Sequence, residues 1–101
     1  MIRAEVRFAQ GDQVPCISQF RGISIYMYTE PDARHRLPHF HAHYAEFMAS
    51  FAISPPALLE GALPRPQLRL VLAWAELYQA ELEQDWHVVQ AGQRPRQLPG
   101  I

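Results

Sequence analysis

The stretch HFHAHYAEFMASFAI, residues 39–53, decides the fold, because it carries two alternating patterns joined by a very short link. In residues 39–44, apolar or aromatic side chains alternate with three histidines, and residues 46–53 place a second apolar set at every other position. Side chains two apart on a strand point to the same face of a sheet. The stretch therefore predicts two half-buried strands, with a tight hairpin around Ala45 between them.

The segments on either side of this hairpin predict the other elements. Residues 22–29 are rich in β-branched and aromatic side chains, which favours a strand, and residues 58–61 predict a short strand after the Ser54-Pro55-Pro56 break. From Pro64 onward, apolar residues recur at i, i+3 and i+4, which predicts a helix. Either this helix runs on, or Asp85 caps a second one. We expect an α+β fold, with a small antiparallel sheet of three to five strands packed against one or two C-terminal helices.

The length of 101 residues suits a single domain, which we place at residues 1–98. Residues 2–8 alternate in polarity, so residues 1–13 are expected to form an extra N-terminal strand or an extension of the domain. Residues 94–101, rich in proline and polar side chains, are expected to form a flexible tail.

The composition excludes several classes of protein. Apolar residues make up 49% of the chain and charged residues 19%, which is typical of a globular domain. The formal net charge of −1 gives no bulk attraction to nucleic acid or membranes, so any such attraction needs a local patch. The single cysteine, Cys16, excludes an intrachain disulfide and a metal site built on several cysteines. With no signal-peptide pattern and no apolar run of roughly 18–20 residues, we expect a cytoplasmic protein without a membrane partner.

The three alternating histidines are candidates for a metal site. Neighbouring histidines on one strand face lie ~6.5–7 Å apart, which lets two of them converge on one divalent ion such as zinc. All three span ~13 Å, so one ion would take two of them and a further ligand. The metal candidates are His39, His41 and His43, with the third ligand drawn from His43, His35, Glu46 or Asp32.

The same residues match the histidine-triad pattern of nucleotide hydrolases and transferases, in which the middle histidine attacks a phosphate. By that match the nucleophile would be His41, supported by its two neighbours. In that superfamily most of the domain precedes the motif, whereas only 38 residues precede it here. This difference in context argues against that chemistry, and no catalytic residue is assigned.

A third interpretation is a surface that binds RNA or a partner protein. Arg34, His35 and Arg36 come just before the histidines and would add positive charge able to hold phosphate. Tyr26 and Tyr28 would share a strand face and could stack on a base. Solvated loop arginines and ordinary packing tyrosines are the alternative interpretation. The candidate binding face comprises Arg34, His35, Arg36, His39, His41 and Glu46.

Three blocks of the chain resemble a family of small prokaryotic proteins, the domain of unknown function 4160 family. The blocks are ISQFRGISIYMY at 17–28, HRLPHFHAHYAEF at 35–47 and LLEGALPRPQLRLVLAWAELYQAELEQDWHVVQAGQ at 58–93, and the resemblance covers roughly residues 14–98. The chain departs from the family pattern at Leu37, where proline is usual, and at Ala45, where glycine is usual. It also departs at His43, where an acidic residue is common. This last departure makes the triad match accidental and leaves His39 and His41 as the principal pair, with His35 third.

The resemblance also implies a genetic context, since members of this family look like parts of two-gene units similar to toxin–antitoxin pairs. We therefore predict a partner- or RNA-binding module that works through the face of His35, His39 and His41, with a protein partner from a neighbouring gene. The first alternative is a metal-binding protein or metal-dependent hydrolase using His39 and His41. The second is a structural or interaction module with no chemistry, and a homo-oligomer is compatible with each.

Overall fold

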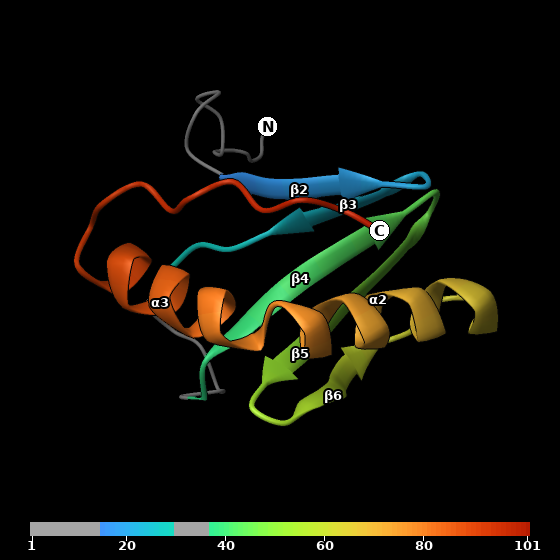
Figure 1. Ribbon diagram of the computed structural model, residues 1–101. Helices are drawn as coiled ribbons and strands as arrows, with labels where there is room; N and C mark the ends of the chain where they lie inside the picture. The colour runs from blue at the N-terminus through green and yellow to red at the C-terminus, as the bar shows by residue number, and fades with distance from the viewer. Residues whose placement is uncertain (1–14, 30–36) are drawn as a thin grey trace, which may run out of the picture.

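The sheet and the helices form separate layers of the domain (Figure 1). The computed structural model describes residues 15–29 and 37–101, and within them it contains five strands and two helices. Each strand pairs antiparallel with the next one in sequence, and the helices follow and lie across one face of the sheet. The elements are β2 (Cys16–Phe20), β3 (Ile23–Tyr26), β4 (His39–Tyr44), β5 (Phe47–Ile53), β6 (Pro56–Gly61), α2 (Arg65–Leu77) and α3 (Gln79–Gln90). The predicted α+β fold is confirmed, while the strand predicted within residues 1–13 lies outside the described residues.

The predicted hairpin of residues 39–53 is the pair β4–β5. Tyr44 pairs with Phe47, so the link consists of Ala45 and Glu46, and Ala45 adopts a φ of +53°. Only glycine adopts this left-handed conformation without a steric cost from Cβ. Alanine at this turn position therefore carries a steric cost that glycine would not carry.

A second hairpin, β2–β3, was not predicted from the sequence. Its turn residues are Arg21 and Gly22, with φ of +52° and +80°, and positive φ at both central residues is the backbone that suits a two-residue hairpin. Strand β2 is short and has a register shift between Cys16 and Ser18, which breaks the period-two pattern that identifies a strand.

The core lies between the helix layer and one face of the sheet. Phe40 on β4 stacks on Phe51 of β5 with ring centroids 5.3 Å apart, and Trp74 of α2 meets Phe40 edge-on at 5.6 Å. All three side chains are fully buried, and Phe20 packs against Trp74 at 5.5 Å. Phe40 and Ala42 of β4 thus face the helices, which turns His41 and His43 to the opposite face.

The helical segment is two short helices separated at Tyr78. The amide of Tyr78 still donates to the carbonyl of Trp74, while its own carbonyl accepts from Leu82 in the next helix. Of the two alternatives, the second helix is present, but Asp85 does not cap it and instead lies inside α3, where it is buried. Its Oδ1 accepts a hydrogen bond of 2.9 Å from the backbone amide of Arg96. Neither α2 nor α3 has the length and apolar character that a membrane crossing needs, and no other helix occurs in the described residues.

The C-terminal segment packs on the domain, which differs from the flexible tail expected for residues 94–101. Leu98 is buried, and its amide donates to the carbonyl of Ile17 on β2 at 2.7 Å. The indole Nε1 of Trp74 donates to the carbonyl of Pro99 at 2.7 Å. Figure 1 shows the segment running along β2, so it covers that edge of the sheet. Composition alone predicted flexibility because it does not reveal these long-range contacts.

Candidate functional site

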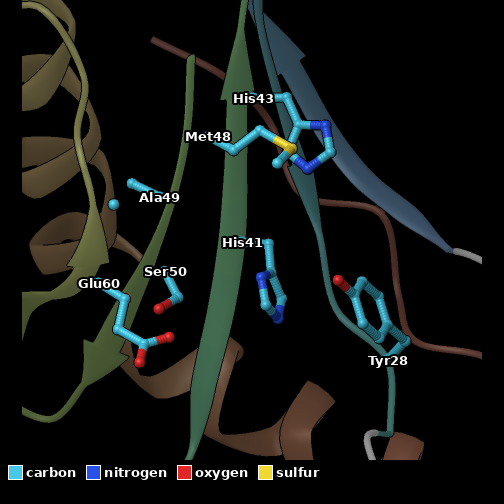
Figure 2. A pocket seen from close by; sticks show the side chains of 8 residues that line it. Tyr28, His41, His43, Met48, Ala49, Ser50 and Glu60 are labelled. Atoms are coloured by element: carbon cyan, nitrogen blue, oxygen red, sulfur yellow. The ribbon is translucent and has the colours of Figure 1, made fainter. Parts of the chain in front are cut away.

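The candidate site lies on the face of the sheet that the helices leave uncovered. On β4, His41 and His43 point to this face, because Phe40 and Ala42 point into the core. His41 pairs with Ser50 on β5, and Ser50 pairs in turn with Glu60 on β6. Paired residues share a face of a sheet. An imidazole, a hydroxyl and a carboxylate therefore form one row across three neighbouring strands, and Figure 2 shows the three side chains next to one another.

Two tyrosines from the β3 segment contact the histidines of β4. The ring of Tyr28 stacks on His41 with centroids 4.6 Å apart and planes 8° apart, and Tyr26 contacts His43 at 4.8 Å. Both contacts are diagonal, since Tyr26 pairs with His41 and Ser24 pairs with His43. The tyrosines thus share the open face as predicted, where they fix the positions of the imidazole rings.

His39 differs from the other two histidines because it is buried, with only 3% of its surface exposed. Its Nδ1 lies 2.8 Å from the carbonyl oxygen of Leu37, and its ring packs at 5.1 Å from Trp86 of α3 and at 5.3 Å from His41. These contacts make His39 a packing residue that holds the ring of His41 from one side. A large ligand does not reach it, because it is buried.

An open pocket of about 490 Å³ occupies the centre of this face (Figure 2). Met48, which is 62% exposed, lies at one side of the pocket, and the row of His41, Ser50 and Glu60 crosses it. A volume of this size is in the range of small-molecule sites, which run from about 300 to 1,000 Å³. We name it the open-face pocket; its lining residues are Tyr28, His41, His43, Met48, Ala49, Ser50, Glu60 and Gly61.

Ser50 is the polar group at the floor of the open-face pocket. Its side chain is only 5% exposed, and its Oγ has no hydrogen-bond partner among the described residues. A buried hydroxyl without a partner costs roughly 1–3 kcal/mol, so such groups are uncommon in folded proteins. Its Oγ is closed off from solvent, so Ser50 forms part of the floor of the pocket and its hydroxyl is not presented to a ligand.

Gly61 lets the end of β6 approach β5 closely beside Glu60. Its φ is +83°, and a Cβ at this position would lie 2.2 Å from the carbonyl oxygen of Met48. That carbonyl accepts a hydrogen bond of 3.1 Å from the amide of Ala62. Any larger residue at 61 would push the strand away, so this glycine positions Glu60 at the pocket.

The electrostatics of the pocket are close to neutral. Burial lowers the pKa of His43, which favours its neutral imidazole. Apart from the two histidines, Glu60 is the one titratable acid or base that carries charge among the described lining residues. None of the described arginines lines the pocket; they are Arg21, Arg65, Arg69, Arg94 and Arg96. Arg34, His35 and Arg36 lie outside the described residues, so the predicted cationic part of the face stays a prediction.

A metal site is not assembled by the described residues. Within residues 15–29 and 37–101, no group of three histidine, cysteine or acidic side chains is arranged to hold a metal ion. Glu46 sits exposed in the β4–β5 turn and does not line the pocket. His35 and Asp32 lie outside the described residues. The metal prediction for His39, His41 and His43 therefore stays a prediction.

The sequence analysis missed Ser50, Met48 and Glu60 as site residues. Ser50 and Met48 occupy the outward positions of the predicted strand of residues 46–53, so their face could have been inferred from the alternation. The place of Glu60 could not have been inferred. A register shift between Ser50 and Phe51 means that its partner on β5 cannot be found by counting residues from the turn.

Comparison with known proteins gives one match. A family model described as "Domain of unknown function (DUF4160)" matches residues 22–87, which span β3 to most of α3 and so include every residue of the open-face pocket. No curated protein and no solved structure matches the chain.

Proposed function

The chain belongs to the DUF4160 family, and from the geometry of its open sheet face we propose that it is an RNA-binding module for single-stranded RNA. The observation that carries this proposal is a set of aromatic and imidazole rings beside a pocket, on the face of the sheet that the helices leave uncovered. Sheet faces that bear aromatic side chains bind single-stranded RNA by stacking its bases. Tyr28 with His41, and Tyr26 with His43, supply two such pairs on adjacent strands.

The polar groups of the pocket suit the edge of a base or a ribose. Glu60 is exposed at the side of the pocket, and its carboxylate accepts hydrogen bonds from N–H and O–H groups. An acceptor beside a stacking surface adds selectivity, because a base edge that offers N–H groups binds more tightly than one that does not.

The charge distribution favours single strands held by stacking over duplexes held by phosphate contacts. Among the described residues no arginine lines the open-face pocket, and Glu60 repels phosphate placed directly above it. Phosphate contacts make binding steeply dependent on salt, with a slope of about −0.7 per contact for single strands. We expect a shallow salt dependence for the chain, with any steeper part supplied by Arg34 and Arg36.

A protein partner from a neighbouring gene is the second candidate, and Met48 favours it. This side chain is 62% exposed beside the aromatic pairs. Exposed methionine next to aromatic rings is common at protein interfaces. Co-purification of the two gene products, compared between the wild type and Met48→Glu, tests this candidate, and loss of co-purification in Met48→Glu would support it.

The proposal is tested by fluorescence anisotropy with a labelled 2′-fluoro oligouridine, which resembles RNA but lacks the 2′-hydroxyl. We expect Tyr28→Ala to raise Kd by about fivefold to 150-fold, because stacking contributes ~1–3 kcal/mol per base. Arg69→Ala on α2 is the matched control and should leave Kd unchanged, since the residue is exposed in the helix layer. Absence of binding by the wild type, or equal losses in the two variants, would contradict the proposal.

A further inference from the structure

The row of His41, Ser50 and Glu60 has a geometry that binding alone does not use. The three residues are in register on β4, β5 and β6. Adjacent strands lie ~4.7–4.9 Å apart, so the backbones that carry His41 and Glu60 are roughly 10 Å apart with Ser50 midway between them. An imidazole and a carboxylate thus flank a buried hydroxyl across three strands of the open-face pocket.

These chemical groups match what the cleavage of RNA needs. The ribose 2′-hydroxyl must lose a proton when it attacks the adjacent phosphorus, and the departing 5′-oxygen must gain one. A carboxylate and an imidazole placed on opposite sides of the phosphate can perform these two transfers. Glu60 is exposed and His41 is partly exposed, so both are within reach of a bound strand.

A serine nucleophile does not fit the same row. A nucleophilic serine is activated by a hydrogen bond to a neighbouring base, usually histidine. The Oγ of Ser50 has no such bond among the described residues, and its side chain is 95% buried, as the exposed fraction of 5% shows. Ser50 therefore takes no direct part in the chemistry and forms part of the floor of the pocket beneath the reacting groups.

Resting on the RNA-binding function proposed above, we propose that the open-face pocket cleaves single-stranded RNA by general acid–base catalysis, with Glu60 as the base and His41 as the acid. Glu60 takes the 2′-hydroxyl proton while the 2′-oxygen forms a bond to phosphorus. The bond from phosphorus to the 5′-oxygen breaks, its electron pair stays on that oxygen, and His41 supplies the proton. One product ends in a 2′,3′-cyclic phosphate and the other begins with a 5′-hydroxyl.

The stacking of Tyr28 on His41 gives the acid a fixed orientation. The two rings lie 8° from parallel with centroids 4.6 Å apart, and buried His39 contacts His41 at 5.3 Å from another side. A ring held by two neighbours keeps its nitrogen aimed at the pocket, and positioning of this kind is a large part of catalytic efficiency. Tyr28 is thus a positioning residue as well as a stacking surface.

The test uses the full chain, purified without a tag, and an unmodified oligouridine in the presence of EDTA. We expect cleavage with 2′,3′-cyclic phosphate ends, identified by mass spectrometry. Glu60→Gln and His41→Gln should each slow it by roughly 100-fold to 10,000-fold, the range for loss of one acid–base group. Arg69→Ala is the control expected to cleave at the wild-type rate.

Binding of the 2′-fluoro oligouridine separates this inference from the proposed function. Glu60→Gln keeps the shape of an exposed side chain, so it should fold as the wild type does, and its affinity for the 2′-fluoro oligouridine is measured beside its cleavage rate. Wild-type binding without cleavage would overturn the catalytic inference and leave the binding function intact. Cleavage that survives in the Glu60→Gln/His41→Gln double variant would come from a contaminating nuclease and would also overturn the inference. Absence of both binding and cleavage would overturn both proposals.

Discussion

Tyr28, two residues beyond the end of β3, stacks on His41 of β4 with ring centroids 4.6 Å apart and planes only 8° apart. This contact joins the end of the β3 segment to the central strand of the sheet at the open-face pocket. It ties the orientation of the imidazole to a residue 13 positions earlier in the chain. The functional account of the protein depends on this pair, because it supplies both a stacking surface and a fixed ring.

Replacing Tyr28 by leucine should show whether RNA binding needs an aromatic ring at this position or only an apolar side chain of similar volume. Leucine retains apolar volume but has no π-face, so Tyr28→Leu is expected to weaken binding of single-stranded RNA by about fivefold or more. Tyr28→Phe keeps the ring and should bind within about twofold of the wild type, since only the hydroxyl is lost. Anisotropy titrations of the two variants give the comparison, and equal affinities would show that stacking by this ring is not used.

The β4–β5 turn should become more stable with glycine at position 45. Ala45 has a φ of +53°, which costs an L-residue with a Cβ about 1–2 kcal/mol. Glycine removes that cost but gains freedom in the unfolded chain, so Ala45→Gly is expected to raise the free energy of unfolding by about 0.5–1 kcal/mol. The control is Ala73→Gly, exposed inside α2, which should lower it by about 1 kcal/mol. Urea unfolding measures both, and a loss of stability in Ala45→Gly would contradict the account of the turn.

The C-terminal segment should contribute directly to the stability of the domain. Leu98 is 7% exposed and belongs to the core cluster, so Leu98→Ala is expected to lower the free energy of unfolding by about 2–3 kcal/mol. Leu77→Ala serves as the control, because this leucine is 63% exposed and should change stability by less than about 0.5 kcal/mol. Equal, small effects in the two variants would show that residues 94–101 behave as the flexible tail first expected.

Asp85 should make stability depend on pH in a defined direction. Burial raises the pKa of its carboxyl above 3.8, and Oδ2 has no hydrogen-bond partner among the described residues. The unfolded chain therefore ionises Asp85 at a lower pH than the folded chain does, so stability falls as pH rises from 3.8 to the folded-state pKa. Asp85→Asn keeps the acceptor for Arg96 and removes the titration. The wild type should lose stability relative to this variant between pH 4 and neutrality, and a constant difference across that window would contradict the claim.

Much of the sheet was predictable because strict alternation survives wherever a strand has one buried and one open face. Residues 39–53 show this, and the structure places β4 and β5 within one residue of the predicted bounds. Strand β2 was not predicted, because its register shift near Cys16 interrupts the alternation of buried and exposed side chains. The break at Tyr78 was not predicted, because the apolar spacing of α2 continues into α3. No local signal in the sequence therefore distinguishes one long helix from two.

The site was only partly predictable because it depends on register between strands. Alternation placed His41 and His43 on one face, but it could not show that the packing of Trp86 buries His39. Glu46, which follows the histidines closely in sequence, was predicted as a candidate third metal ligand and as part of the binding face. The structure brings Glu60 to the pocket instead, since two strand pairings link it to His41 through Ser50. Proximity of this kind is set by the sheet and not by spacing along the chain.

The most direct test of the RNA-binding face is methyl NMR of methionine-labelled protein during a titration with 2′-fluoro oligouridine. Met48 lines the open-face pocket, whereas Met27 is fully buried in the core and serves as an internal control. We predict that the Met48 methyl signal shifts progressively with added oligouridine while the Met27 signal stays in place. A Met48 signal that does not move under the same conditions would contradict the assignment of this face as the RNA-binding surface.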